Sequence, residues 1–267
     1  MTRFARNLFF GAVILVLSAP LFVVAGVSLN EKKFMMFPPR GISLRWYTEL
    51  FEKAKWSDSL VNSLVVATSA GFVALSIALP IAYFLWRYRV RYARALYALG
   101  LLPFTLPPVL TALGMLLFWS QIGYVGTIEN IILGHSLFLI TLPMVMISLG
   151  LESIDMEVIE AARTMGADDR TTFITVILPL ILPYLVTGYA FVFVFSMNEF
   201  IISYFLGQFA ISTLPVKIFS QLRSGYSPVI ASAAVTFILL ATVIFGLIAR
   251  FGDLPKLLGS QTARDNE

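Results

Sequence analysis

Residues 160–179 read EAARTMGADDRTTFITVILP, a polar stretch in a chain that is otherwise strongly apolar. Gly166 permits a backbone turn that residues with a Cβ adopt poorly. The acidic Asp168 and Asp169 follow, and acidic residues favour the start of a helix because they cap its free N–H groups and oppose its dipole. The segment 151–179 therefore predicts two short helices around a turn.

The rest of the chain has the composition of a membrane protein. Of its 267 residues 58% are hydrophobic and 13% are charged, against about 25% charged in soluble domains, and the mean hydropathy is +0.86. Six apolar segments are long enough to cross a bilayer: residues 8–29, 60–86, 95–118, 131–150, 180–206 and 228–250. The sequence predicts an all-α membrane protein with one transmembrane domain of six helices, the first of them an uncleaved helix rather than a signal peptide.

Short connections between these segments predict the orientation. The connection 87–94, RYRVRYAR, carries four arginines, whereas 119–130 contains no Lys or Arg. Because basic residues are retained on the cytoplasmic side, both termini and the segment 151–179 are expected inside. The expected outer segment 30–58 carries six basic residues, which does not fit this rule.

Two further patterns concern helix geometry. Between residues 46 and 54, apolar side chains recur at helical spacing, which predicts a helix lying flat at the membrane surface or a docking surface for an external partner. Pro103, Pro107 and Pro108 predict a kinked helix that faces protein or a water-filled path.

Cysteine and histidine counts exclude several kinds of site. The chain has no Cys and one His, so it offers no disulfide framework, thiol nucleophile or His/Cys zinc site. Its net charge of +4 comes from Lys and Arg residues beside apolar segments. A lipid bilayer explains these charges better than nucleic acid does.

The polar segment also carries a family pattern. Residues 160–179 resemble the EAA loop of the permease subunits of ATP-binding-cassette importers, whose pattern is EAA, three residues, Gly, nine residues, Ile, one residue, Leu-Pro. The matching positions are Glu160, Ala161, Ala162, Gly166, Leu178 and Pro179, and Val176 replaces the Ile. The resemblance implies that these matching residues, together with Ala167, couple the chain to an ATPase, with Glu160 offering a charge to a basic surface.

This resemblance implies the type I importer permease fold in a bacterial cytoplasmic membrane. It also implies three kinds of partner: a second permease that completes the solute path, a homodimeric cytoplasmic ATPase, and a periplasmic or extracellular solute-binding protein. ATP and Mg²⁺ would be bound by the ATPase, and the 267 residues contain no G-x-x-x-x-G-K-[ST] phosphate loop. The chain itself is expected to be neither an enzyme nor a metal-binding protein.

A candidate solute path lies in the fifth apolar segment. Glu199 is an acid in an apolar span, and such a group is a candidate functional residue by default. The expected path residues are Ser196, Asn198, Glu199 and Ser203. The alternative is a structural acid bonded to a neighbouring helix or partner subunit.

The region around Glu199 resembles spermidine/putrescine-type permeases, which tend to have two acids where this chain has Asn198 and Glu199. The resemblance implies a polyamine or another small amine-bearing solute. The alternatives are aminoethylphosphonate, opines, thiamine, iron and sulfate.

His135 is interpreted as a hydrogen-bonded packing residue rather than a proton relay, because no second ionisable group lies near it in sequence. Two rival functions remain. An ion-coupled secondary transporter would use Glu199 and His135 for protons, but internal repeats are not evident. A membrane-embedded enzyme would need a denser group of polar side chains.

Overall fold

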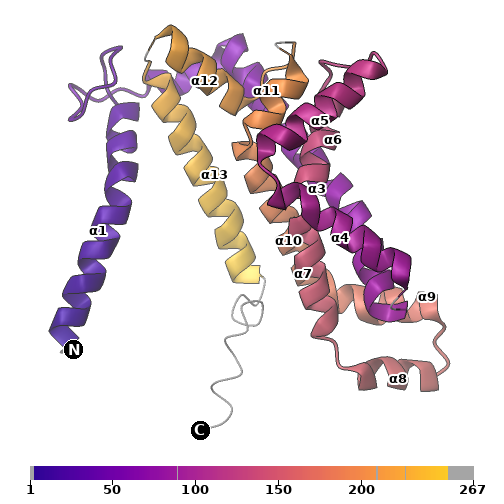
Figure 1. The fold of residues 1–267 in the computed structure, drawn as a ribbon. Helices are drawn as coiled ribbons and strands as arrows, with labels where there is room; N and C mark the ends of the chain where they lie inside the picture. Colours follow the sequence, from indigo (N-terminus) through magenta and orange to yellow (C-terminus); the bar gives the residue numbers. More distant parts are fainter. Residues whose placement is uncertain (1–2, 89, 209, 226, 252–267) are drawn as a thin grey trace. The chain divides into compact units, whose positions relative to one another are not determined.

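The computed structural model describes residues 3–251 except 89, 209 and 226. These residues form helices, joined by loops with one isolated bridge between Asn30 and Ile42 (Figure 1). The helices are α1 (Arg3–Ser28), α2 (Arg45–Glu52), α3 (Ala54–Tyr88), α4 (Arg91–Thr105), α5 (Pro108–Gln121), α6 (Ile128–Leu139), α7 (Thr141–Glu152), α8 (Met156–Thr164), α9 (Asp169–Thr172), the π-helix η1 (Phe173–Ile177), α10 (Leu178–Asn198), α11 (Ile201–Gly207), α12 (Leu214–Ser224) and α13 (Val229–Phe251). The predicted all-α class is confirmed.

Four uninterrupted helical stretches of the described chain are long and apolar enough to cross a membrane. They are α1, α3, the stretch Asp169–Asn198 that ends with α10, and Val229–Leu247 of α13. Two further pairs are bent, α4 with α5 by 113° and α6 with α7 by 46°. The described residues thus hold four candidate spans, or six if each bent pair is one span. The six-span count and the position of the termini stay predictions.

Proline causes the sharper of these bends. Leu106 between α4 and α5 is extended, with φ −86° and ψ 150°. A residue before proline is pushed out of the helical region, and Pro107 and Pro108 have no N–H with which to continue the helix. The predicted kink is confirmed, but residues 95–118 form two helices rather than one.

The chain divides into two compact units, Met1–Leu60 with Val216–Thr242, and Val61–Pro215 with Val243–Glu267. In the first unit, α2 is the helix that the apolar spacing predicted. Its Trp46 and Leu50 are buried. The Trp46 indole N–H donates to the Asn30 carbonyl, and the Ser232 hydroxyl donates to the Trp46 carbonyl at 3.2 Å. Protein therefore covers part of the apolar face of α2, which was expected to lie at the membrane surface or against an external partner.

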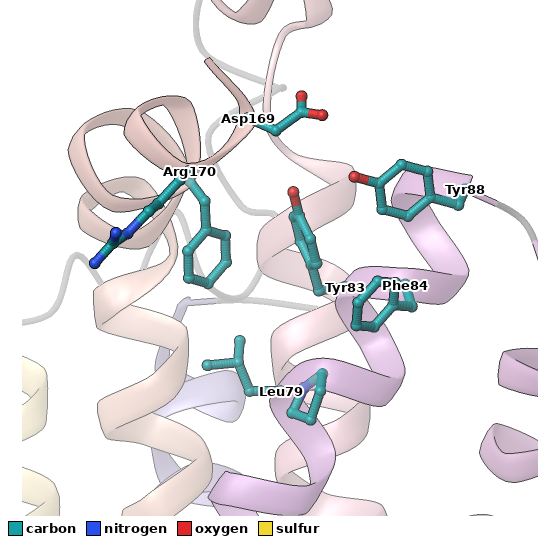
Figure 2. A pocket seen from close by; sticks show the side chains of 8 residues that line it. Leu79, Tyr83, Phe84, Tyr88, Asp169 and Arg170 are labelled. Atoms are coloured by element: carbon teal, nitrogen blue, oxygen red, sulfur yellow. The ribbon is translucent and has the colours of Figure 1, made fainter. Parts of the chain in front are cut away.

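In the second unit, α8 and α9 lie at one end and α11 at the other (Figure 1). The end of α3 packs on the segment that follows α9. There the rings of Tyr83 and Phe173 meet edge to face with their centroids 4.8 Å apart. Figure 2 shows the Tyr83 hydroxyl directed toward Asp169. This contact joins a long candidate span directly to the polar segment 151–179.

Candidate functional site

The start of the polar segment, from α8 to the turn at Gly166, folds as its sequence predicts. Asp155 caps α8 by accepting the Glu157 N–H at 3.0 Å, and Asp168 caps α9 by accepting the Thr171 N–H at 2.7 Å. Between the two helices Gly166 has φ +92°, a backbone conformation that favours glycine. The first short helix and the glycine turn are confirmed, but the second helix is not separate, because α9 continues through η1 into α10 and the helical stretch begins at Asp169 rather than at residue 180.

Electrostatic contacts hold this turn together. The carboxylate of Asp169 pairs with Arg163 of α8 and lies 3.8 Å from a guanidinium nitrogen of Arg87 at the end of α3. Two hydrogen bonds from Thr171 hold the pKa of Asp168 below its ordinary value. The bond from the Thr171 side chain has the larger effect and the bond from its backbone N–H the smaller one. The two short helices are therefore tied to each other and to α3.

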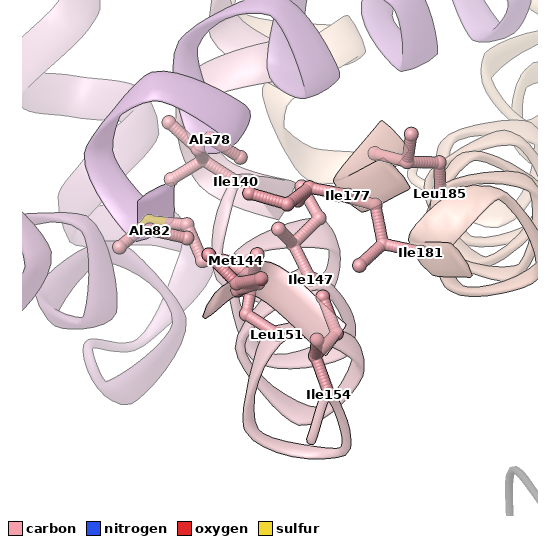
Figure 3. Packing of buried hydrophobic residues seen from close by; sticks show 11 residues of the cluster. Ala78, Ala82, Ile140, Met144, Ile147, Leu151, Ile154, Ile177, Ile181 and Leu185 are labelled. Carbon is pink, nitrogen blue, oxygen red and sulfur yellow. The ribbon is translucent and has the colours of Figure 1, made fainter. Parts of the chain in front are cut away.

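Apolar side chains anchor the same segment in the helix bundle. Ile154 before α8, Ile159 of α8 and Ile177 of η1 are buried in one core cluster. The cluster also contains Ala78 and Ala82 of α3, and residues of α7 and α10 (Figure 3). Because side chains in such a core interlock, the segment is anchored to α3, α7 and α10.

Five of the predicted coupling residues lie on α8 or in the turn that follows it. Glu160, Ala161 and Gly166 are exposed and Ala167 is partly exposed, whereas Ala162 faces inward and is buried. Beside them Met165 is 82% exposed. Sequence reasoning missed Met165, although an apolar residue in the polar run EAARTMG is a visible signal.

Leu178 and Pro179 lie elsewhere, at the junction of η1 and α10. The Leu178 N–H bonds to the Phe173 carbonyl, the spacing of a π-helix. Pro179 has no N–H with which to bond to the carbonyl four residues earlier. Leu178 packs against the core cluster and Pro179 is exposed. The structure thus separates these two predicted coupling residues from the exposed face of α8.

A second candidate site lies where the fifth predicted span breaks. The sequence predicts one continuous span over residues 180–206. In the structure α10 ends at Asn198, and Glu199 is extended, with φ −71° and ψ 119°. The Glu199 carboxylate turns to the start of α11 and accepts the N–H groups of Ile201 and Ile202, each at 2.9 Å. It also accepts the Ser203 N–H at 3.3 Å. The break occurs where a carboxylate can cap the next helix.

His135 of α6 connects the two sides of this break. Its ring is fully buried, with Nδ1 2.6 Å from the Ser196 hydroxyl and Nε2 2.9 Å from the Ser203 hydroxyl. Nε2 also lies 3.4 Å from the Glu199 carboxylate, whose side chain is 8% exposed. The structure thus brings together three of the four predicted path residues. Both hydroxyl contacts agree with the interpretation of His135 as a hydrogen-bonded packing residue.

Asn198, the fourth predicted path residue, is exposed, and its amide donates weakly to the Val194 carbonyl at 3.5 Å. The contact between His135 and Glu199 was missed, because α6 and the break after α10 lie far apart in sequence. Among the described residues no group of three or more His, Cys, Asp or Glu could hold a metal ion.

The sequence of this chain is similar to those of known transport proteins. Residues 74–253 match the family described as binding-protein-dependent transport system inner membrane component. The spermidine/putrescine permease protein PotC of Haemophilus influenzae is 27% identical over 91% of this chain and 95% of its own length. The putrescine permease protein PotI of Escherichia coli is 30% identical, over 87% and 85%. The putative 2-aminoethylphosphonate permease protein PhnV of Salmonella paratyphi A is 28% identical, over 91% and 90%.

Solved structures support the same fold. A chain of a bacterial ABC transporter that imports the acidic polysaccharide alginate superimposes with a TM-score of 0.69 at 17% identity, over 93% of this chain and 95% of that one. A chain of the inward-facing methionine transporter MetNI gives 0.63 at 21% identity, over 74% and 96%. With a family match over most of its length and the fold of type I importer permeases, this chain belongs to the family of inner membrane permease components of binding-protein-dependent ABC transport systems.

Proposed function

We propose that the chain is the permease subunit that forms a solute path together with a second permease, driven by ATP hydrolysis in a separate ATPase dimer. An external binding protein delivers the solute, and ATP and Mg²⁺ are bound by the ATPase rather than by this chain. Both termini and the segment 151–179 face the cytoplasm in this proposal. The observation that carries it is the exposed face of α8, anchored in the bundle core through Ile154 and Ile159.

The coupling role follows from the two faces of α8. Its exposed face offers Glu160 and the small Ala161 to a partner surface, and Met165, the residue directly after the helix, adds an exposed apolar side chain. Its inner face, with Ile159 and Ala162, is fixed to the bundle. A partner that displaces α8 therefore displaces α3, α7 and α10 as well. Leu178 and Pro179 contribute by shaping the junction that connects the segment to α10.

The solute path is proposed at the break between α10 and α11. Irregular backbone in a membrane is tolerated only where protein or a water-filled cavity surrounds it. Asn198 lies at this break with an exposed polar side chain, which is costly against lipid. We place Asn198 on the path, with Glu199 beside it as the source of negative charge. His135, Ser196 and Ser203 hold that carboxylate in position.

The proposed solute is a small molecule that carries one or more amino groups. The relatives compared above are named for spermidine, putrescine or 2-aminoethylphosphonate, which all carry an amine. A carboxylate at the helix break favours a cationic group nearby. Polyamine is the first candidate and aminoethylphosphonate the second, because the phosphonate charge would meet the same carboxylate unfavourably.

Uptake in cells that express the chain with its partner subunits tests this proposal. Glu160→Lys should lower uptake of labelled putrescine about tenfold, which corresponds to about 1.4 kcal/mol of lost coupling, and should reduce ATPase co-purification. Glu52→Lys, a charge reversal at an exposed residue of α2, is the matched control and should leave both unchanged.

Competition defines the solute class in the same assay. Unlabelled spermidine should compete with putrescine, and sulfate should not. Normal uptake and normal ATPase co-purification in Glu160→Lys would refute the coupling role. Equal competition by sulfate would refute the amine specificity but leave the coupling role standing.

A further inference from the structure

A pocket of about 380 Å³ lies between the end of α3 and the segment that runs from α9 into η1. Its volume lies within the range of small-ligand sites. One end is apolar and is formed by Leu79, Pro80 and Phe84 of α3. At the other end, the hydroxyl groups of Tyr83 and Tyr88 lie near Asp169 (Figure 2). The pocket is therefore lined almost entirely by apolar surface, with Asp169 and Arg170 as its charged lining residues.

The charges in and around this pocket favour an anion. Asp169 is already compensated, because it pairs with Arg163 and lies 3.8 Å from Arg87. Arg170 lines the pocket and adds a further positive charge. Asp169 and Arg170 balance each other within the lining, so the excess of positive charge comes from residues beside the pocket. When Arg87, Arg163 and Asp168 are counted as well, three arginines exceed two carboxylates by one positive charge, and the Asp168 carboxylate is already engaged as the cap of α9.

The position of the pocket along α3 matches the boundary of a bilayer. The 35 residues of α3 extend roughly 52 Å at 1.5 Å per residue, well beyond a hydrocarbon core of about 30 Å. The pocket residues occupy its last turns, where Arg87 and two tyrosines lie, and tyrosine and arginine are typical of the membrane interface. Phe84 and Tyr88 are 40% and 47% exposed, so the pocket opens outward from α3.

We propose that this pocket binds a phospholipid with an anionic headgroup. An acyl chain lies against Leu79, Pro80 and Phe84, and the phosphate lies beside Arg170 and Arg87. The lipid then bridges α3 and the α9–η1 segment, supplementing the contact between Tyr83 and Phe173. Membrane composition thereby acts on the position of the segment 151–179. This lipid site does not depend on the identity of the transported solute.

Native mass spectrometry of the assembled transporter tests this site. The complex is extracted from nanodiscs that contain equal amounts of phosphatidylglycerol and phosphatidylcholine, and the lipids it retains are counted. The wild-type complex should retain phosphatidylglycerol in preference to phosphatidylcholine. Leu79→Trp fills the apolar end and should reduce retention of both lipids. Arg170→Gln should reduce the preference for phosphatidylglycerol about fivefold, the effect expected for one arginine near a headgroup.

Matched controls separate this pocket from general lipid adhesion. Leu99→Trp enlarges an exposed residue of α4 outside the pocket, and Arg94→Gln removes an exposed charge outside it. Both should retain the wild-type lipid pattern, and size-exclusion profiles should show that all four variants assemble. A wild-type complex with no preference for phosphatidylglycerol would overturn the proposal. So would equal loss in the pocket variants and their controls.

Discussion

Gly166→Ala isolates the backbone of the turn between α8 and α9. Gly166 has φ +92°, and a Cβ added to it would meet nothing within 4 Å. The substitution therefore strains the backbone without a steric clash with neighbouring groups. A left-handed conformation costs a residue with a Cβ about 1–2 kcal/mol. This strain lowers the population of the native turn, relative to other conformations of the same residues, by about 5- to 30-fold.

The consequence for coupling follows from this population. A partner that binds the native turn binds more weakly by the same factor, at most about 30-fold. ATPase co-purification and putrescine uptake per assembled complex should both fall in Gly166→Ala. Gly166→Asn should fall between Ala and wild type, because Asn tolerates positive φ better than most residues.

Gly123→Ala is the matched control. Gly123 also has positive φ, +69°, and a Cβ added there would likewise meet nothing within 4 Å. It precedes α6 and lies outside the segment 151–179. The substitution carries similar strain and should leave ATPase co-purification unchanged. Equal effects of Gly166→Ala and Gly123→Ala, or wild-type coupling in both, would refute a role for this turn in coupling.

Three further predictions concern other parts of the chain. His135→Ala removes the shared partner of Ser196, Ser203 and Glu199, and each group left unsatisfied costs about 1–3 kcal/mol. The midpoint of thermal unfolding should therefore fall by several degrees, whereas Asn198→Ala, at an exposed residue, should leave it unchanged. Glu199→Gln deletes the charge and keeps one acceptor oxygen; uptake normalised to assembled complex should fall for putrescine, and an unchanged value would remove Glu199 from the solute path. The pKa of Asp168 is lower in the folded chain than in the unfolded chain, so its ionised carboxylate stabilises the turn at pH values above the unfolded-state pKa. This stabilisation is lost as the pH falls through the folded-state pKa and the carboxylate becomes protonated. Limited proteolysis of the segment 151–179 should therefore accelerate below about pH 4, and Asp168→Asn should weaken this dependence.

Local chemistry explains which features the sequence could predict. The turn at Gly166 and the cap at Asp168 depend on residues a few positions apart, so the sequence carries them. The kink between α4 and α5 depends on proline and is equally local. The face of α2 shows the limit of periodicity, which predicts an apolar face but not whether lipid or protein covers it.

The break at Glu199 required information from elsewhere in the fold. Residues 196–205, SMNEFIISYF, read as a continuous apolar span, and nothing in their spacing marks a helix end. The end is stabilised by the capping carboxylate and by His135 from α6, a contact between residues far apart in sequence. Met165 stands out in the sequence as an apolar residue in a polar run, but its exposure depends on how the preceding helix α8 is anchored by Ile159.

Site-specific crosslinking tests most directly whether α8 docks on the ATPase. Since the chain has no cysteine, Met165→Cys places a single exposed thiol directly after α8, and Gln121→Cys places one at the exposed end of α5. A crosslinker that joins a thiol to a nearby lysine is added to the complex of each variant, in membranes opened to the reagent on both sides. If α8 docks as proposed, Met165→Cys forms an adduct of this chain with the ATPase and Gln121→Cys forms none. An adduct from Gln121→Cys alone would contradict this docking.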